Sequence, residues 1–196
     1  MLHAILLAAV VVPCHAARTQ SQLDDCWAAR AAQARTALDG VYPRAKAAVR
    51  KLDVDPKLLA AAQSAWNDAR KATCAFEVSL VAGGSIAPMV RSTCDDRITR
   101  ARTARLEALV AAAATAKPLP PLKPIAPATD AELNRLYGSL AERIEPVQQT
   151  ALTASDVAWI AYRDRACKLE GGDCLTQMER ERIAELKAGW SGEPFW

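Results

Sequence analysis

The hydrophobic pattern of the first half of the chain predicts three helices. Apolar residues, mostly alanine, recur among polar ones across 22–52, and we expect this helix to bend or break at Pro43. A second helix is expected from Asp55, which precedes a proline, to about Val81. After a glycine-containing loop, Thr93 is the predicted N-cap of the third helix, and Asp96 completes a pattern similar to a capping box.

The second half predicts three more helices in the same order. Asp130 begins the first, and residues 152–170 form the second. Gly171 and Gly172 end that helix, and Asp173 caps the last one, which runs to about residue 188. Because alanine is abundant and glycine sparse, the pattern indicates an all-α protein.

Five prolines between residues 117 and 127 separate the two halves. Proline at this density excludes a helix and favours an extended, semi-rigid segment. We therefore expect a helical module over 17–116, a proline-rich linker over 117–129 and a second module over 130–196. The alternative is a proline-rich loop that wraps over one compact domain.

The two halves repeat one motif, W-x3-R-x3-C-x-[FL]-E. The three defining residues stand at i, i+4 and i+8 and share one helical face. We expect a buried tryptophan, an arginine paired with a carboxylate and a disulfide-bonded cysteine; the alternative is an exposed Trp/Arg binding surface. The matched positions also include a tyrosine upstream and a cysteine and an arginine downstream: Tyr42, Trp66, Arg70, Cys74, Cys94 and Arg102 in the first copy, and Tyr137, Trp159, Arg163, Cys167, Cys174 and Arg182 in the second. Asp164 has no acidic counterpart in the first copy.

The N-terminus is typical of a secretory signal. Residues 4–12 are a continuous apolar run, too short to span a bilayer, and Ala16 fits the position before a cleavage site. We expect residues 1–16 to be removed together with Cys14, and no transmembrane segment in the mature chain. A lipoprotein anchored through Cys14 is less favoured, because Pro13 directly precedes it. The alternative is a buried N-terminal helix.

In each copy, one cysteine lies near the end of the second helix and another opens the third. This placement predicts two disulfides, Cys74–Cys94 and Cys167–Cys174, and an oxidising compartment. Cys26 is then the odd cysteine: it is free, pairs between chains or exchanges with the first pair. Metal binding is not expected, because there is no C-x2-C motif and both histidines lie in the signal segment.

Charge and composition exclude several functions. A net charge of +3 without a run of lysine or arginine does not indicate a nucleic-acid partner. No histidine remains after residue 16 to activate a nucleophile, and there is no glycine-rich phosphate loop. We therefore expect neither an enzyme nor a cofactor.

The order of these motifs resembles the N-terminal domain of the lysozyme inhibitor LprI family, in two tandem copies. The second copy matches it through Tyr137, Trp159, Tyr162-Arg163-Asp164, Cys167 and Cys174, and the first through Tyr42, Trp66, Arg70, Cys74, Gly83-Gly84-Ser85 and Cys94. The resemblance implies a helical, disulfide-bonded protein that is periplasmic or secreted, and some members of the family are associated with inhibition of lysozyme.

On this resemblance we expect a protein that blocks a lysozyme by inserting a loop into its sugar cleft. The candidate contact residues are those of the two predicted hairpin loops: Gly83, Gly84, Ser85, Arg91, Gly171, Gly172 and Asp173. The alternative is an envelope module that binds another protein or a wall polymer. The aromatic tail, residues 189–196, either docks on a partner or folds back over its own module.

Overall fold

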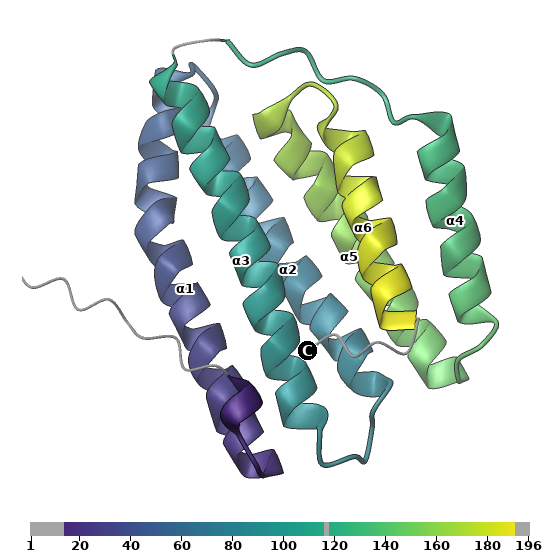
Figure 1. Ribbon diagram of the computed structural model, residues 1–196. Coiled ribbons are helices and arrows are strands. Elements are labelled where there is room, and N and C mark those ends of the chain that lie inside the picture. Colours follow the sequence, from purple (N-terminus) through teal and green to yellow (C-terminus); the bar gives the residue numbers. More distant parts are fainter. Residues whose placement is uncertain (1–13, 116–117, 191–196) are drawn as a thin grey trace, which may run out of the picture.

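The computed structural model describes residues 14–115 and 118–190, and these residues contain helices and no strands (Figure 1). The fold is therefore all-α, as predicted, with three α-helices in each of the two modules. The 3₁₀ turn and the helices, in chain order, are η1 (Cys14–Ala16), α1 (Gln20–Lys51), α2 (Pro56–Ser79), α3 (Ala87–Ala114), α4 (Pro127–Ala141), α5 (Pro146–Glu170) and α6 (Cys174–Trp190).

Two predictions about helix boundaries in the first module are wrong. α1 continues through Pro43, so of the two expected outcomes, a bend or a break, the break is wrong. α3 begins at Ala87 rather than after Thr93, because Pro88 occupies its first turn, where a proline costs no helical hydrogen bond. The Thr93 hydroxyl instead donates to the carbonyl of Val90 inside this helix.

Two other helices begin with side-chain caps, of which the one at Asp55 was expected. The Asp55 carboxylate accepts from the backbone N–H of Lys57 at 2.9 Å, ahead of the proline in the first turn of α2. α5 begins at Pro146, six residues before the predicted start. Glu145 and Gln148 form a reciprocal capping box there, which the sequence analysis missed.

The two modules form one body because α2 packs extensively against α5, while α1 packs against α3. α2 and α5 run in opposite directions, so the α2–α3 loop and the α5–α6 turn lie at opposite ends of the molecule (Figure 1). Repeat-equivalent residues occupy equivalent places in the shared core. Those that are buried in both modules include Leu38 and Leu133, Leu59 and Leu152, Trp66 and Trp159, Arg102 and Arg182, and Leu106 and Leu186.

The proline-rich linker is bound along the α5–α6 turn. The backbone N–H of Lys123 donates to the carbonyl of Gly172 at 2.9 Å, and the N–H of Gly172 donates to the carbonyls of Pro120 and Pro121, each at 3.2 Å. Farther along, the N–H of Ala126 donates to the Thr176 hydroxyl. The linker is therefore hydrogen-bonded to the second module at several positions.

The predicted disulfides Cys74–Cys94 and Cys167–Cys174 are both present. A third disulfide joins Cys14 to Cys26, because η1 turns back onto the start of α1 and brings the two Cα atoms within 5.7 Å. Cys26 is therefore bonded to Cys14, and not free, paired between chains or exchanging with the Cys74–Cys94 pair as expected. No cysteine among the described residues is free.

In the part of the chain that the structure describes, no helix combines the length and hydrophobicity that crossing a membrane requires. The predicted aromatic tail lies largely outside the described residues, which end at Trp190.

Candidate functional site

The repeated tryptophan and arginine of the first module are structural. Trp66 is 3% exposed, and the guanidinium of Arg70 lies 5.3 Å from the centre of its ring. Arg70 also pairs with the Asp95 carboxylate at 2.6 Å. This arrangement confirms the expected reading of the motif for this copy.

The second module repeats the arrangement with a different acid. The guanidinium of Arg163 lies 5.4 Å from the ring centre of the buried Trp159 and pairs with Glu179 at 2.7 Å. Asp164 also accepts from Arg163, at 2.9 Å, from the exposed side. Because both tryptophans are buried, the alternative of an exposed Trp/Arg surface is wrong.

The two motif tyrosines, Tyr42 and Tyr137, make different contacts in the two modules. Tyr42 packs half-buried against the core, with the ammonium of Lys46 over its ring at 4.9 Å. The Tyr137 hydroxyl accepts from the Nε of Arg182 at 2.9 Å. Burial raises the pKa of Tyr137 to about 12, against the opposing charge of Arg182, so this hydroxyl stays protonated.

A polar seam joins the modules, and the sequence analysis did not anticipate it. Arg182 donates to the Ser155 hydroxyl at 2.9 Å, and Ser155 shares a hydrogen bond of 3.0 Å with Thr73 of the other module. Arg97 of α3 pairs with Glu185 of α6 at 3.0 Å. Arg105 of α3 pairs with Glu170 of α5 at 2.7 Å and also with Glu181 of α6. The sequence held one indication of this seam, because the repeat aligns Arg182 with Arg102. The structure buries both arginines.

We expect mild acid to stabilise the fold. Burial is the main cause that raises the pKa of Glu77 and Glu170 above their ordinary value of 4.5, and Arg97 and Arg105 oppose it. The folded state then binds more protons than the unfolded chain, so the free energy of unfolding rises as the pH falls from 7 toward 4.5. Thermal melts followed by circular dichroism should show a melting temperature that rises over this pH range. Glu77→Gln should make the melting temperature depend less on pH. A melting temperature that falls steadily over this range would contradict the prediction.

The predicted contact loops differ in how accessible they are. Gly83, Gly84 and Ser85 are exposed at the tip of the α2–α3 loop, where Gly83 needs its positive φ of 81°, and Arg91 is exposed nearby on α3. At the other end of the molecule, the linker is hydrogen-bonded to Gly172, as described above.

The remaining two residues of the α5–α6 turn are also engaged by the linker. A Cβ on Gly171 would lie 2.0 Å from the carbonyl oxygen of Pro120. Asp173 is exposed but pairs with Lys123 at 3.2 Å. Of these two described loops, the α2–α3 loop is the one that the linker leaves uncovered, and the two loops cannot enter one cleft together.

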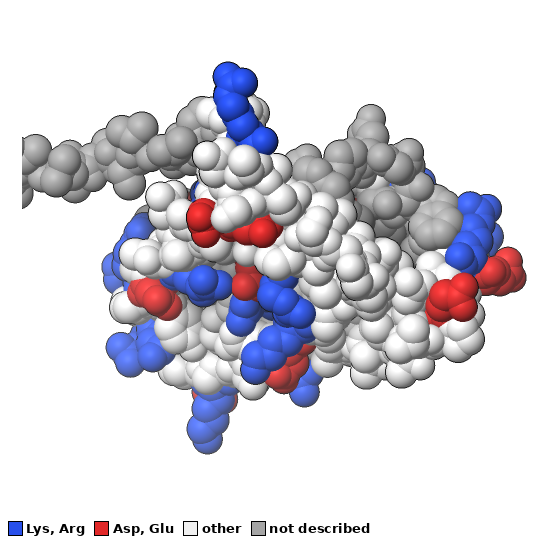
Figure 2. All heavy atoms as spheres, turned by 90° about the horizontal axis from the view of Figure 1, so that it is seen from below, with Lys and Arg blue, Asp and Glu red and all other residues white. Residues whose placement is uncertain are grey.

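The open loop lies in a surface that we call the uncharged end. Its members are Val81, Ala82, Gly83, Gly84, Ser85, Ile86 and Val147, none of them charged. Val147 is 73% exposed, and the neighbouring Gln148 donates to the carbonyl of Ser79, which ties α5 to the loop. Seen from this end, a broad area without Lys, Arg, Asp or Glu separates charged groups on either side (Figure 2).

The loop is held in shape before any partner arrives. The Gly84 N–H donates to the Val81 carbonyl at 3.0 Å, and the Ala87 N–H donates to the Gly84 carbonyl at 3.3 Å. The Cys74–Cys94 disulfide crosslinks the two helices that carry the loop. A preordered loop loses little entropy when it binds, which favours a docking role.

Comparison with known proteins agrees with this fold. The lysozyme inhibitor LprI family matches residues 14–106 and 126–186, two segments consistent with tandem copies. An uncharacterised protein from Burkholderia thailandensis has a crystal structure with a TM-score of 0.68 to this chain. The two share 19% sequence identity over 89% of this chain and 90% of that one, which shows a common fold.

No curated protein matches the chain. Among the described residues, no group of three or more His, Cys, Asp or Glu side chains is placed to hold a metal ion. The family match covers most of the chain and includes all six bonded cysteines. The chain belongs to the lysozyme inhibitor LprI family.

Proposed function

We propose that this protein is an exported, non-enzymatic inhibitor that blocks a lysozyme by binding to it. The observation that carries the proposal is the family match over both modules. The disulfides support export, because such bonds persist in oxidising compartments such as the periplasm.

The contact surface in this proposal is the uncharged end. Its loop enters the sugar-binding cleft, where a lysozyme keeps two catalytic carboxylates, and Arg91 lies at the edge of the contact. Many lysozymes are basic, and a chain of net charge +3 is not steered toward them electrostatically. An uncharged contact surface avoids local repulsion between two positively charged proteins.

The Cys14–Cys26 disulfide also changes the position at which we propose that the signal peptide is cleaved. Cleavage after Ala16 would remove one half of this bond, so we place cleavage before Cys14. Lipid attachment to Cys14 would use the sulfur that forms the disulfide. A mature protein without a lipid anchor, in the periplasm or secreted, is the form that retains all three bonds.

Purified, oxidised protein beginning at Cys14 is expected to inhibit lysis of bacterial cell walls by lysozyme in a dose-dependent way. Ala82→Asp places an anion in the exposed loop, which would face the two carboxylates of the cleft, and is expected to weaken inhibition at least about tenfold, because like charges at a contact cost more than about 1.4 kcal/mol. The matched control is Ala111→Asp, an exposed position on α3 away from the loop, which should inhibit like the wild type.

No inhibition of lysozymes from several classes would overturn this proposal. The fold would then be that of an envelope module that binds another protein or a wall polymer. Equal loss of inhibition in Ala82→Asp and Ala111→Asp would instead show that the uncharged end is not the contact surface.

A further inference from the structure

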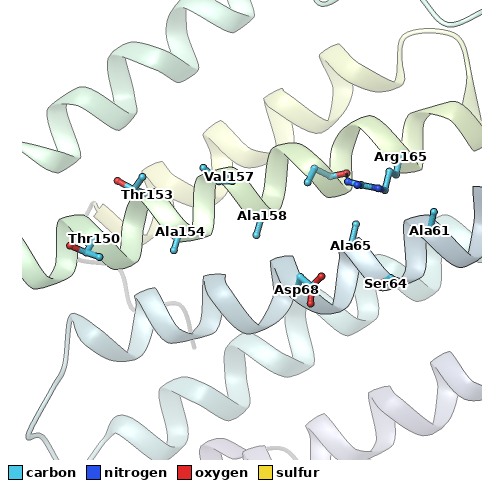
Figure 3. Close-up of a pocket in the computed structure, with 11 residues that line it drawn as sticks. Ala61, Ser64, Ala65, Asp68, Thr150, Thr153, Ala154, Val157, Ala158 and Arg165 are labelled. Atoms are coloured by element: carbon cyan, nitrogen blue, oxygen red, sulfur yellow. Dashed lines mark hydrogen bonds between the residues drawn. The ribbon is translucent and has the colours of Figure 1, made fainter.

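A groove of about 920 Å³ runs between α2 and α5. It opens on the side of these helices that faces away from α3 and α6, and side chains of both helices line it (Figure 3). Its walls are mostly small and apolar, including Ala61 and Ala65 on α2 and Ala154 and Ala161 on α5. The groove lies apart from the uncharged loop at the end of the molecule.

α5 is apolar on two faces, although only one of them meets the core. Leu152 and Trp159 are buried. A second stripe at alternating spacings of four and three, Thr150, Ala154, Val157 and Ala161, lines the groove on the outer side of the helix. Val157 in this stripe is 63% exposed. This spacing is that of the seam positions in a coiled coil, where helices of two chains pack together.

The two charged residues that line the groove have opposite signs and lie on opposite walls. Asp68 comes from α2 and Arg165 from α5. Neither forms an ion pair with another described residue, and the Arg165 guanidinium donates to the Ala161 carbonyl of its own helix at 2.8 Å. A surface that carries one acid and one base in this way is self-complementary, as a twofold interface requires.

We propose that the groove is the interface of a homodimer, in which a second copy of the chain packs its own α2 and α5 against this pair as a four-helix bundle. Val157 enters the opposite groove, and Asp68 meets Arg165 of the partner subunit. The groove takes in residues 61–68 of α2 and 150–165 of α5, so it forms the centre of the proposed contact, and Asp68 and Arg165 lie within it.

Sedimentation equilibrium of the oxidised protein at micromolar concentration is expected to give twice the monomer mass. Val157→Asp is expected to raise the dissociation constant of the dimer at least about tenfold, because it places like charges together at the twofold axis. Its circular dichroism should be unchanged, since Val157 is largely exposed. Ala111→Asp, outside the groove, is the matched control and should remain dimeric.

A charge exchange tests the arrangement directly. Asp68→Arg alone should weaken the dimer, and adding Arg165→Asp should restore it. A monomeric wild type would overturn the proposal, and so would a dimer that Val157→Asp leaves intact. Because mass and not inhibition is measured, these outcomes are independent of the proposed function.

Discussion

Arg182→Ala is expected to lower the free energy of unfolding by about 3–5 kcal/mol, the range found when one member of a buried polar cluster is removed. Arg182 is only 3% exposed and hydrogen-bonds to Tyr137 and Ser155. It also pairs with Glu185 and lies 5.8 Å from the ring centre of Trp159. Its loss therefore removes packing and leaves buried polar groups without partners on the seam between the modules. Urea unfolding followed by circular dichroism measures the change.

Arg180→Ala is the matched control, two residues earlier on the same helix. Arg180 is exposed, so its replacement should change the free energy of unfolding by no more than about 0.5 kcal/mol. Arg182→Lys should not restore wild-type stability, because an ammonium cannot reproduce the planar set of donors. Equal destabilisation by Arg180→Ala and Arg182→Ala would show that the seam does not hold the modules together.

Gly171→Ala is expected to destabilise the protein by about 3 kcal/mol or more, the upper part of the range for a strained backbone position. Gly171 has a φ of 66°, and an added Cβ would meet the backbone oxygen of Pro120 at 2.0 Å. Since a backbone atom cannot rotate aside, the linker must leave the turn. The hydrogen bond from Lys123 to Gly172 should then be lost, and hydrogen exchange at the Lys123 amide should accelerate.

The same substitution in α4 should act in the opposite direction. Gly138 lies inside a helix, and a Cβ there would meet no atom within 4 Å. Gly138→Ala should therefore stabilise the protein by about 0.5–1 kcal/mol through its higher helix propensity. If Gly171→Ala left both the stability and the Lys123 exchange rate unchanged, the linker would not be bound to the turn in solution.

Features with a strong local signal were predictable from the sequence. Tryptophan and cysteine are rare, so the repeat around Trp66 and Trp159 identified the equivalent helices, and the cysteine positions identified two disulfides. The boundary of α3 was missed because Thr93 has the chemistry of an N-cap but lies inside the helix. Pro88 gave the better signal.

Features that depend on tertiary structure were not predictable. Cys14 lies next to an apolar run typical of a leader, and only the return of η1 onto α1 brings it to Cys26. In the site, the glycines of both loops had the same local pattern. What separates Gly83 from Gly172 is the path of the linker, which no local pattern specifies.

The linker on the α5–α6 turn also determines how many binding tips the chain offers. The repeat places a hairpin tip at each end of the molecule, yet a partner that recognises such a tip finds just the α2–α3 loop open among the described residues. If the proposed function holds, we therefore expect the chain to be monovalent despite its internal duplication. Linking two modules confers avidity only when both can bind at once, so one partner per chain is the expected stoichiometry.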